Sequence, residues 1–194
     1  MNPMKGVLDD KTTMGSSIYP AKGDPVEKEI YARALYPTKN NLPEKTRIQV
    51  TTQLQDRLVD SIDLTLQAKQ AHWNVKGPSF IALHELFDKV SEEAEGYVDL
   101  IAERIVQLGG IAVGTLGPVD KRSSLPVYPL TISSGREHIA ALSHSLASFG
   151  ESIRESIGQA NEIKDADTAD ILTEISRRVD KYLWFVEAHG QAIN

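Results

Sequence analysis

The segment 79–108 constrains the fold more than any other part of the chain, because its ligand-type side chains are arranged about a single centre. Two pairs of residues share that centre: His84 with Glu103, and Asp88 with Asp99. The common midpoint is the peptide bond between Glu93 and Ala94. At about 100° per residue, all four side chains lie within roughly a 100° stripe of a straight α-helix. The pattern therefore predicts one long helix with these groups on one face.

The four side chains cannot bind one metal ion within one chain. On a helix, Asp88 and Asp99 would lie about 16 Å apart, whereas metal–oxygen and metal–nitrogen bonds are only about 2 Å long. Suppose instead that two copies cross antiparallel at the shared centre. The half of the helix that carries Asp88 then faces the partner's half that carries Asp99. The spacing predicts two equivalent metal sites, each completed across a twofold axis.

Apolar residues at helical spacing predict further helices along the chain. The expected helices are residues 45–75, residues 79–108 with Ser79 as N-cap, a third that contains the apolar positions from Ile139 to Ile157, and a fourth that begins near Asp167 or Thr168. In the first helix the repeating apolar positions are Leu54, Leu58, Ile62 and Leu66. Residues 111–134, with their glycines and prolines, are expected to form a crossover loop with room for a short helix. Two helical hairpins joined by a long crossover predict an all-α, ferritin-like four-helix bundle.

The N-terminal part of the chain differs in composition from the rest. Residues 1–44 hold five of the nine prolines and show no sustained periodicity, so we expect an N-terminal extension there and the bundle in residues 45–194. No apolar run is long enough to span a membrane, and the first residues lack the apolar core of a signal peptide. A cytoplasmic location is therefore expected.

Charge and cysteine content narrow the possible chemistry. The chain has no cysteine, which excludes disulfides, thiolate metal sites and cysteine nucleophiles. The formal net charge is −6, and most of the excess of acids lies in the segment 79–108. Such a helix face attracts cations better than nucleic acid.

Several segments resemble the Dps family, the DNA-binding proteins from starved cells. They are AKQAHWNVKGPSFIALHELFD, VDLIAERIVQLGG, LPVYPL, DADTADILTEISRRVD and KYLWFVE, and the similarity extends over residues 45–189. The resemblance implies a hollow homododecamer of four-helix subunits that oxidises Fe(II) and stores ferric mineral. It also implies a ferroxidase centre at a twofold interface. The matching positions are His72, His84 and Asp88 on one subunit, with Asp99 and Glu103 on its neighbour.

The resemblance further implies iron as the metal and hydrogen peroxide, in preference to oxygen, as the oxidant. Imidazole and carboxylate ligands suit iron, but zinc competes for such ligands, so a static zinc site is an alternative. The Glu-x-x-His motif of di-iron centres within one subunit is absent from the sequence. A centre of that type is therefore not expected.

DNA binding is the alternative function, with iron oxidation secondary in a DNA-condensing, nucleoid-associated protein. The members of the family that bind DNA usually do so through lysine-rich flexible tails, by neutralising phosphates. Here residues 1–25 carry three lysines and three aspartates, a net charge of zero. The extension therefore argues against DNA binding.

A few other residues carry weaker expectations. Trp184 is expected to pack in the bundle, and Trp73 either packs at a subunit interface or donates electrons beside His72. The acids Glu151, Glu155, Asp165 and Asp167 either line an iron-uptake pore or act as helix caps and exposed polar residues. His138, His144 and His189 match no ligand spacing.

Overall fold

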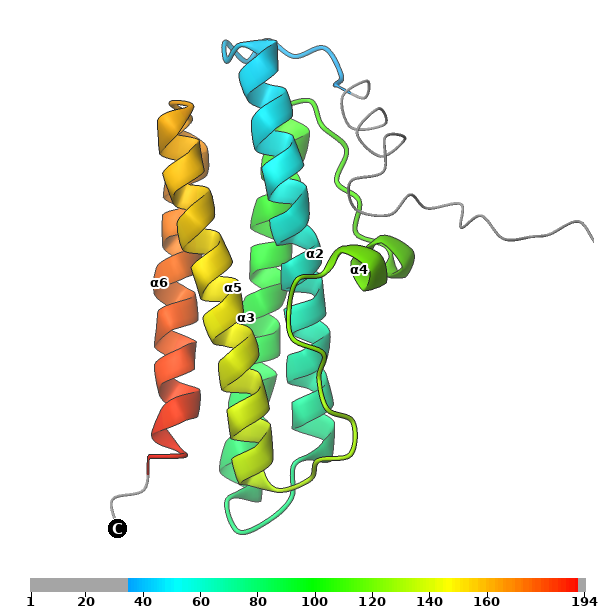
Figure 1. Ribbon diagram of the computed structural model, residues 1–194, viewed down its shortest axis with the longest axis vertical. Coiled ribbons are helices and arrows are strands. Elements are labelled where there is room, and N and C mark those ends of the chain that lie inside the picture. The colour runs from blue at the N-terminus through cyan, green and yellow to red at the C-terminus, as the bar shows by residue number, and fades with distance from the viewer. Residues whose placement is uncertain (1–34, 192–194) are drawn as a thin grey trace, which may run out of the picture.

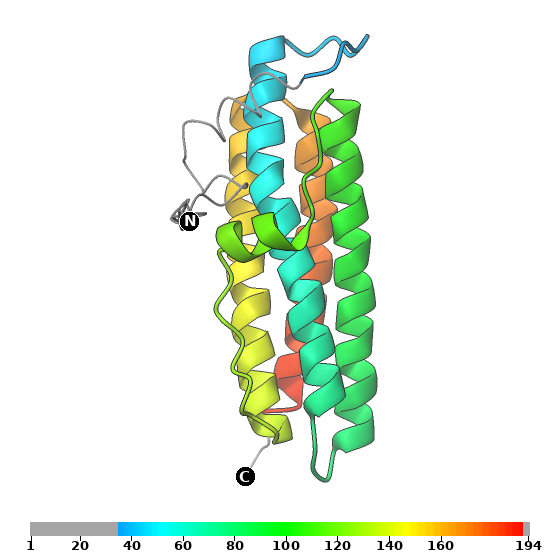
Figure 2. The same cartoon turned by 90° about the vertical axis from the view of Figure 1, so that its right-hand side faces the viewer.

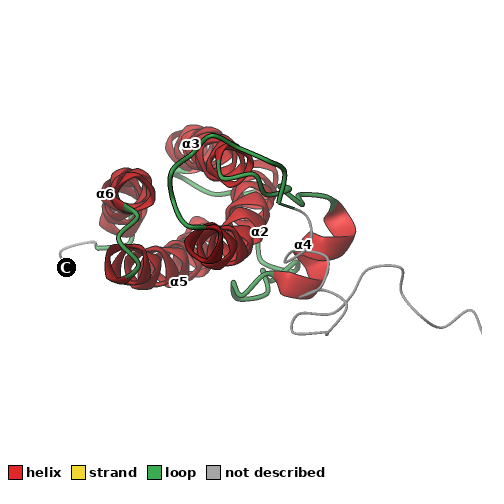
Figure 3. Ribbon diagram, turned by 90° about the horizontal axis from the view of Figure 1, so that it is seen from above, coloured by secondary structure: helices red, strands yellow, loops and turns green. Residues whose placement is uncertain are grey.

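The computed structural model describes residues 35–191, which form α-helices without any strand. The helices are α2 (Glu44–Asn74), α3 (Phe80–Gln107), α4 (Leu116–Arg122), α5 (Gly135–Glu162) and α6 (Ala166–Ala188). Helices α2 and α3 form one hairpin and α5 and α6 form the other, and the two hairpins lie side by side (Figure 1). Seen end-on, α2 packs against α5 and the short helix α4 lies outside the bundle (Figure 3). The predicted all-α, ferritin-like bundle is confirmed.

The helix bounds follow the predicted pattern closely. Gly77, with a φ of 115°, lies in the turn after α2, which ends at Asn74, one residue before the predicted end. Ser79 is the N-cap of α3, although its side chain makes no capping hydrogen bond. The crossover contains α4, as anticipated. Of the predicted N-terminal extension, residues 1–34 lie outside the described residues, and α2 begins at Glu44.

The core lies between the two hairpins and is formed by the apolar faces of the four long helices. Leu54, Phe87, Phe149 and Leu172 are fully buried. Leu66 departs from the pattern, because its side chain is 47% exposed. A four-residue repeat advances about 40° per step around a helix, so it rotates away from a straight apolar stripe.

The fourth long helix, α6, begins at Ala166, one or two residues before the predicted start. Asp165 is the N-cap, and its carboxylate accepts a hydrogen bond from the backbone N–H of Thr168 at 3.1 Å. The same carboxylate forms a buried ion pair with Arg104, at 2.8 Å. Asp165 is only 2% exposed and therefore does not line a pore, whereas Glu151, Glu155 and Asp167 are exposed.

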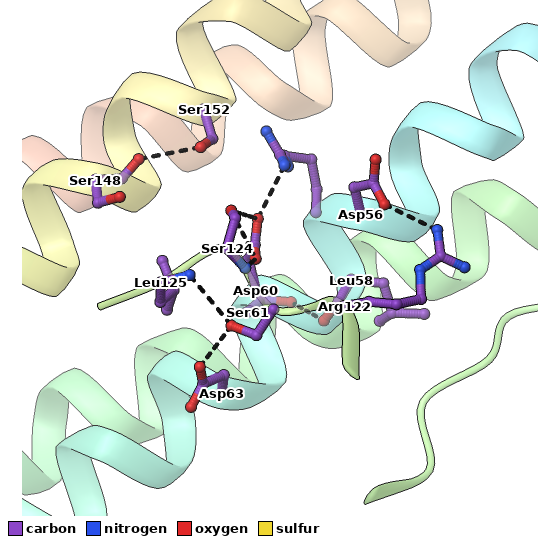
Figure 4. A network of polar contacts seen from close by, with 12 residues as sticks. Asp56, Leu58, Asp60, Ser61, Asp63, Arg122, Ser124, Leu125, Ser148 and Ser152 are labelled. Atoms are coloured by element: carbon purple, nitrogen blue, oxygen red, sulfur yellow. Dashed lines mark hydrogen bonds and ion pairs between the residues drawn. The ribbon is translucent and has the colours of Figure 1, made fainter. Parts of the chain in front are cut away.

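The crossover passes over α2 and is held there by polar contacts (Figure 2). Asp60, fully buried on α2, accepts hydrogen bonds from the Ser124 backbone N–H at 2.7 Å and from the Ser124 hydroxyl (Figure 4). Arg122 binds Asp56 at 2.8 Å. Burial raises the pKa of Asp60, and the Arg57 guanidinium at 2.9 Å opposes that shift. These contacts fix the path of the crossover along α2.

None of the helices in residues 35–191 combines the length and apolar character that a bilayer crossing requires.

Candidate metal centre

Two histidines meet where the α2–α3 hairpin closes. His72 lies in the last turn of α2 and His84 in the second turn of α3. Their rings stack with centroids 3.7 Å apart and planes inclined by 21°. The Nδ1 atom of each ring lies 2.8 Å from the backbone carbonyl oxygen of the other residue. The pair is therefore held by two reciprocal hydrogen bonds.

These hydrogen bonds determine which ring nitrogen can bind a metal. A carbonyl oxygen only accepts, so Nδ1 must carry the proton and donate in both residues. In the neutral imidazole the lone pair then belongs to Nε2. Metal-binding histidines usually donate their other N–H to a carbonyl or carboxylate, which fixes the orientation of the ring. In both rings Nε2 is therefore the nitrogen left available to a metal.

Asp88, the third ligand predicted on this side, lies beside the histidine pair. It lies one helical turn after His84 on α3, and its Oδ1 is 3.9 Å from Nδ1 of His72. The ammonium group of Lys69 contacts the same oxygen. The hydrogen bond from Lys69 is the main reason that the pKa of Asp88 lies below its usual value. Asp88 is therefore an ionised carboxylate, partly exposed at 34% of its side chain.

The other two predicted ligands lie farther along α3. Asp99 and Glu103 are exposed, toward the C-terminal half of the helix. Within residues 35–191 of one chain, no three His, Asp or Glu side chains gather closely enough to hold a metal ion. His72 and His84 contact each other and Asp88 lies beside them, but the three do not form a closed metal site, and Asp99 and Glu103 lie farther along α3.

Lys69 is the neighbour of the site that the sequence analysis missed. It precedes His72 by three residues on α2, a spacing that places both on the same helix face. This three-residue spacing could have identified Lys69 from the sequence. A cation beside a predicted metal ligand holds the carboxylate in its charged form while no metal is bound, and it opposes an incoming cation.

The remaining histidines and tryptophans differ in how deeply their side chains are buried. His138 is buried and lies 2.8 Å from the Tyr128 hydroxyl, and burial lowers its pKa. Trp73, next to His72, is 66% exposed. Trp184 is 62% exposed, so the expectation that it packs in the bundle was wrong. It packs against Phe185 on the surface of α6, with ring centroids 4.9 Å apart.

Comparison with known proteins identifies the family. A family model described as the ferritin-like domain matches residues 51–194. A DNA protection during starvation protein of Agrobacterium fabrum is 46% identical over 154 residues, which cover 79% of this chain and 95% of that relative. This chain belongs to the Dps family. The resemblance predicted from the sequence motifs is thereby confirmed.

Solved Dps structures share the fold. The tetragonal form of Mycobacterium smegmatis Dps has a TM-score of 0.77 and 34% identity, over 81% of this chain and 96% of that one. Dps from Microbacterium arborescens, in a high iron form, has a TM-score of 0.74 and 30% identity, over 81% of this chain and 100% of that one. Each similarity covers 81% of this chain.

Proposed function

We propose that this Dps protein is a ferroxidase and iron-storage cage. It oxidises Fe(II) with hydrogen peroxide and holds the ferric product, which protects DNA from iron-driven oxidation. The observation that supports this most is the His72–His84 pair, with both Nε2 atoms left for a metal and the ionised Asp88 beside it. Imidazole nitrogen and carboxylate oxygen together suit iron.

The site is proposed to be complete only when two chains meet. Asp99 and Glu103 of a neighbouring subunit supply the remaining carboxylates, as the symmetric spacing along α3 predicts. The exposed apolar side chains around the hairpin support such a contact: Leu66, Trp73, Phe80 and Ile81 are between 42% and 66% exposed. Side chains of this kind are typical of surfaces that become buried in an assembly. A homododecamer with its centres at twofold interfaces is the assembly proposed here, and the likeness to solved Dps structures supports a cage.

The proposed reaction balances with peroxide as the oxidant. Two Fe(II) ions each give one electron, and hydrogen peroxide takes up both electrons and two protons to form two molecules of water. Carboxylates stabilise the Fe(III) product because their charge favours the more highly charged ion. Iron is the substrate and the stored cargo. The relative from Microbacterium arborescens, described in a high iron form, supports iron over zinc.

DNA condensation is not proposed as the main activity. It was expected to depend on the extension, of which residues 1–34 lie outside the described residues.

Anaerobic Fe(II) titration of the assembled protein, followed in ultraviolet absorbance after addition of peroxide or air, tests the proposal. Rapid ferric formation with peroxide and slow formation with air is the expected result. Glu103→Gln should abolish the rapid phase, whereas Glu85→Gln, an exposed acid on the same helix, should retain it. No acceleration over buffer by the unmodified protein would contradict the proposal, as would an unchanged rate in Glu103→Gln.

A further inference from the structure

A second candidate site lies at the end of the bundle where the α2–α3 turn, the start of α5 and the end of α6 come together (Figure 1). These segments line a cleft of about 320 Å³. Its apolar side is formed by Leu83 and Ile139. Lys76, Arg136 and His189 line it as well, one from each of the three segments. The cleft therefore brings together basic residues that are far apart in the sequence.

The charge of this cleft is opposite to that of the chain as a whole. Lys76 and Arg136 are cations, His189 becomes one on protonation, and no Asp or Glu lines the cleft. Within the described residues, none of the three forms an ion pair with a carboxylate. In a protein with a net charge of −6, cations that converge without carboxylate partners favour an anionic ligand.

The nearest acid in the sequence is already engaged in a helix cap. One carboxylate oxygen of Glu137 accepts hydrogen bonds from the Ser134 hydroxyl at 2.6 Å, the Ser134 N–H at 3.1 Å and the Ser133 N–H at 3.4 Å. The hydrogen bond from the Ser134 hydroxyl is the largest cause of the lowered pKa of Glu137. This acid closes the capping box of α5 and is not among the residues that line the cleft.

The backbone holds the cleft in shape. The Lys76 N–H donates to the Ser133 carbonyl at 2.9 Å, which joins the α2–α3 turn to the start of α5. Ser79, at the start of α3, also lines the cleft, and no side chain caps that helix. A helix N-terminus carries a positive partial charge, which adds to the field of the basic side chains. The backbone segments that carry Lys76 and Arg136 are thus joined before any ligand binds.

We propose that this cleft binds an oxyanion of the phosphate class through Lys76 and Arg136. A guanidinium group donates two parallel hydrogen bonds to a phosphate, and an ammonium group acts as a point charge beside it. The oxyanion comes either from free phosphate or from a phosphate of a nucleic-acid backbone. Neither Lys76 nor Arg136 belongs to the proposed metal centre, so this inference stands independently of the ferroxidase proposal.

Calorimetric titration of the iron-free, assembled protein with inorganic phosphate in a chloride buffer tests the inference. Saturable binding of one phosphate per chain is expected, and Lys76→Gln/Arg136→Gln should weaken it by about tenfold or more. Both residues are exposed, so assembly should be preserved in size-exclusion chromatography. The matched control is Lys45→Gln/Arg177→Gln, which removes two exposed cations elsewhere and should change the affinity less than about twofold.

A competition experiment distinguishes the two sources of the oxyanion. If a short DNA duplex displaces phosphate from the unmodified protein and binds the Lys76→Gln/Arg136→Gln variant more weakly than the control variant, the cleft accepts nucleic-acid phosphates. If the duplex leaves phosphate bound, the ligand is free phosphate. No saturable phosphate binding, or equal weakening in both double variants, would overturn the inference whatever the ferroxidase assay shows.

Discussion

His72 and His84 each donate the Nδ1–H of their ring to the backbone carbonyl of the other, at 2.8 Å in both directions. The two residues lie on different helices, so these bonds join the end of α2 to the beginning of α3. They also leave Nε2 as the nitrogen available to a metal in both rings. The contacts that close a helical hairpin thereby fix the orientation of two imidazoles.

Removal of one imidazole should abolish the rapid oxidation of iron. For His72→Ala we expect the initial rate of ferric formation with peroxide to fall by roughly a hundredfold or more, because a ligand and its hydrogen bond are lost together. His144→Ala, which removes an exposed histidine on α5, should keep the rate of the unmodified protein. Stopped-flow absorbance on both assembled variants measures the difference, and equal rates would exclude His72 as a ligand.

Replacement of Lys69 should strengthen metal binding at the candidate centre. The Lys69 ammonium contacts Asp88, and it repels an incoming divalent cation. In Lys69→Met we expect Fe(II) to bind roughly five- to tenfold more tightly under anaerobic conditions, as partly exposed charges interact only modestly. Lys89→Met removes an exposed lysine one residue after Asp88 and serves as the control. Weaker binding in Lys69→Met would mean that the lysine positions Asp88 and does not compete with the metal.

The buried ion pair between Arg104 and Asp165 should make a large contribution to stability. Asp165→Ala deprives the buried Arg104 guanidinium of its buried carboxylate partner and removes the cap of α6, so the free energy of unfolding should fall by about 3–5 kcal/mol. Asp167→Ala, two residues farther along and exposed, should cost less than about 1 kcal/mol. Urea denaturation of the assembled protein at equal protein concentration provides the comparison. Similar losses in both variants would contradict this role of the pair.

His138 should make the stability depend on pH in the weakly acidic range. Burial lowers its pKa in the folded state, so the unfolded chain binds the proton first as pH falls below about 6.5. The free energy of unfolding therefore falls progressively as the pH drops from about 6.5 to the folded-state pKa. The contribution of neutral His138 is fully present above about pH 6.5. His138→Gln should remove this part of the dependence when thermal unfolding is compared at pH 5.5 and 7.5. An identical pH dependence in the variant would contradict the assignment.

The helical hairpins could be predicted from the sequence because helix periodicity and turn residues are local signals. Gly77-Pro78 stops one helix and Ser79 starts the next, and both effects depend only on nearby backbone geometry. The exposure of Trp184 could not be predicted in this way. Its position is off the apolar stripe of α6 marked by Val179 and Val186, but a large aromatic residue is more often buried than exposed.

Only part of the candidate site, likewise, could be predicted from the sequence. The spacing along α3 indicates which residues share a face, and the structure places Asp88 and the two histidines at one end of that face. The pairing of Asp165 with Arg104 depends on contacts between residues far apart in the chain, which no local pattern reveals. The proposed contribution of Asp99 and Glu103 from a neighbouring subunit stays a prediction.

The central claim, that each centre is shared by two chains, is tested most directly by mixing two inactive variants. One is His72→Ala/His84→Ala and the other is Asp99→Ala/Glu103→Ala, and each alone should lack rapid peroxide-dependent iron oxidation. Co-assembled from equal amounts of the two unfolded chains, the mixed cage should recover roughly a quarter of the unmodified centres. Half of its twofold interfaces then join unlike chains, and one of the two sites at each such interface is intact. Recovery of rapid oxidation in the mixture is the predicted result. A mixed cage that stays as inactive as its parents would contradict the shared centre.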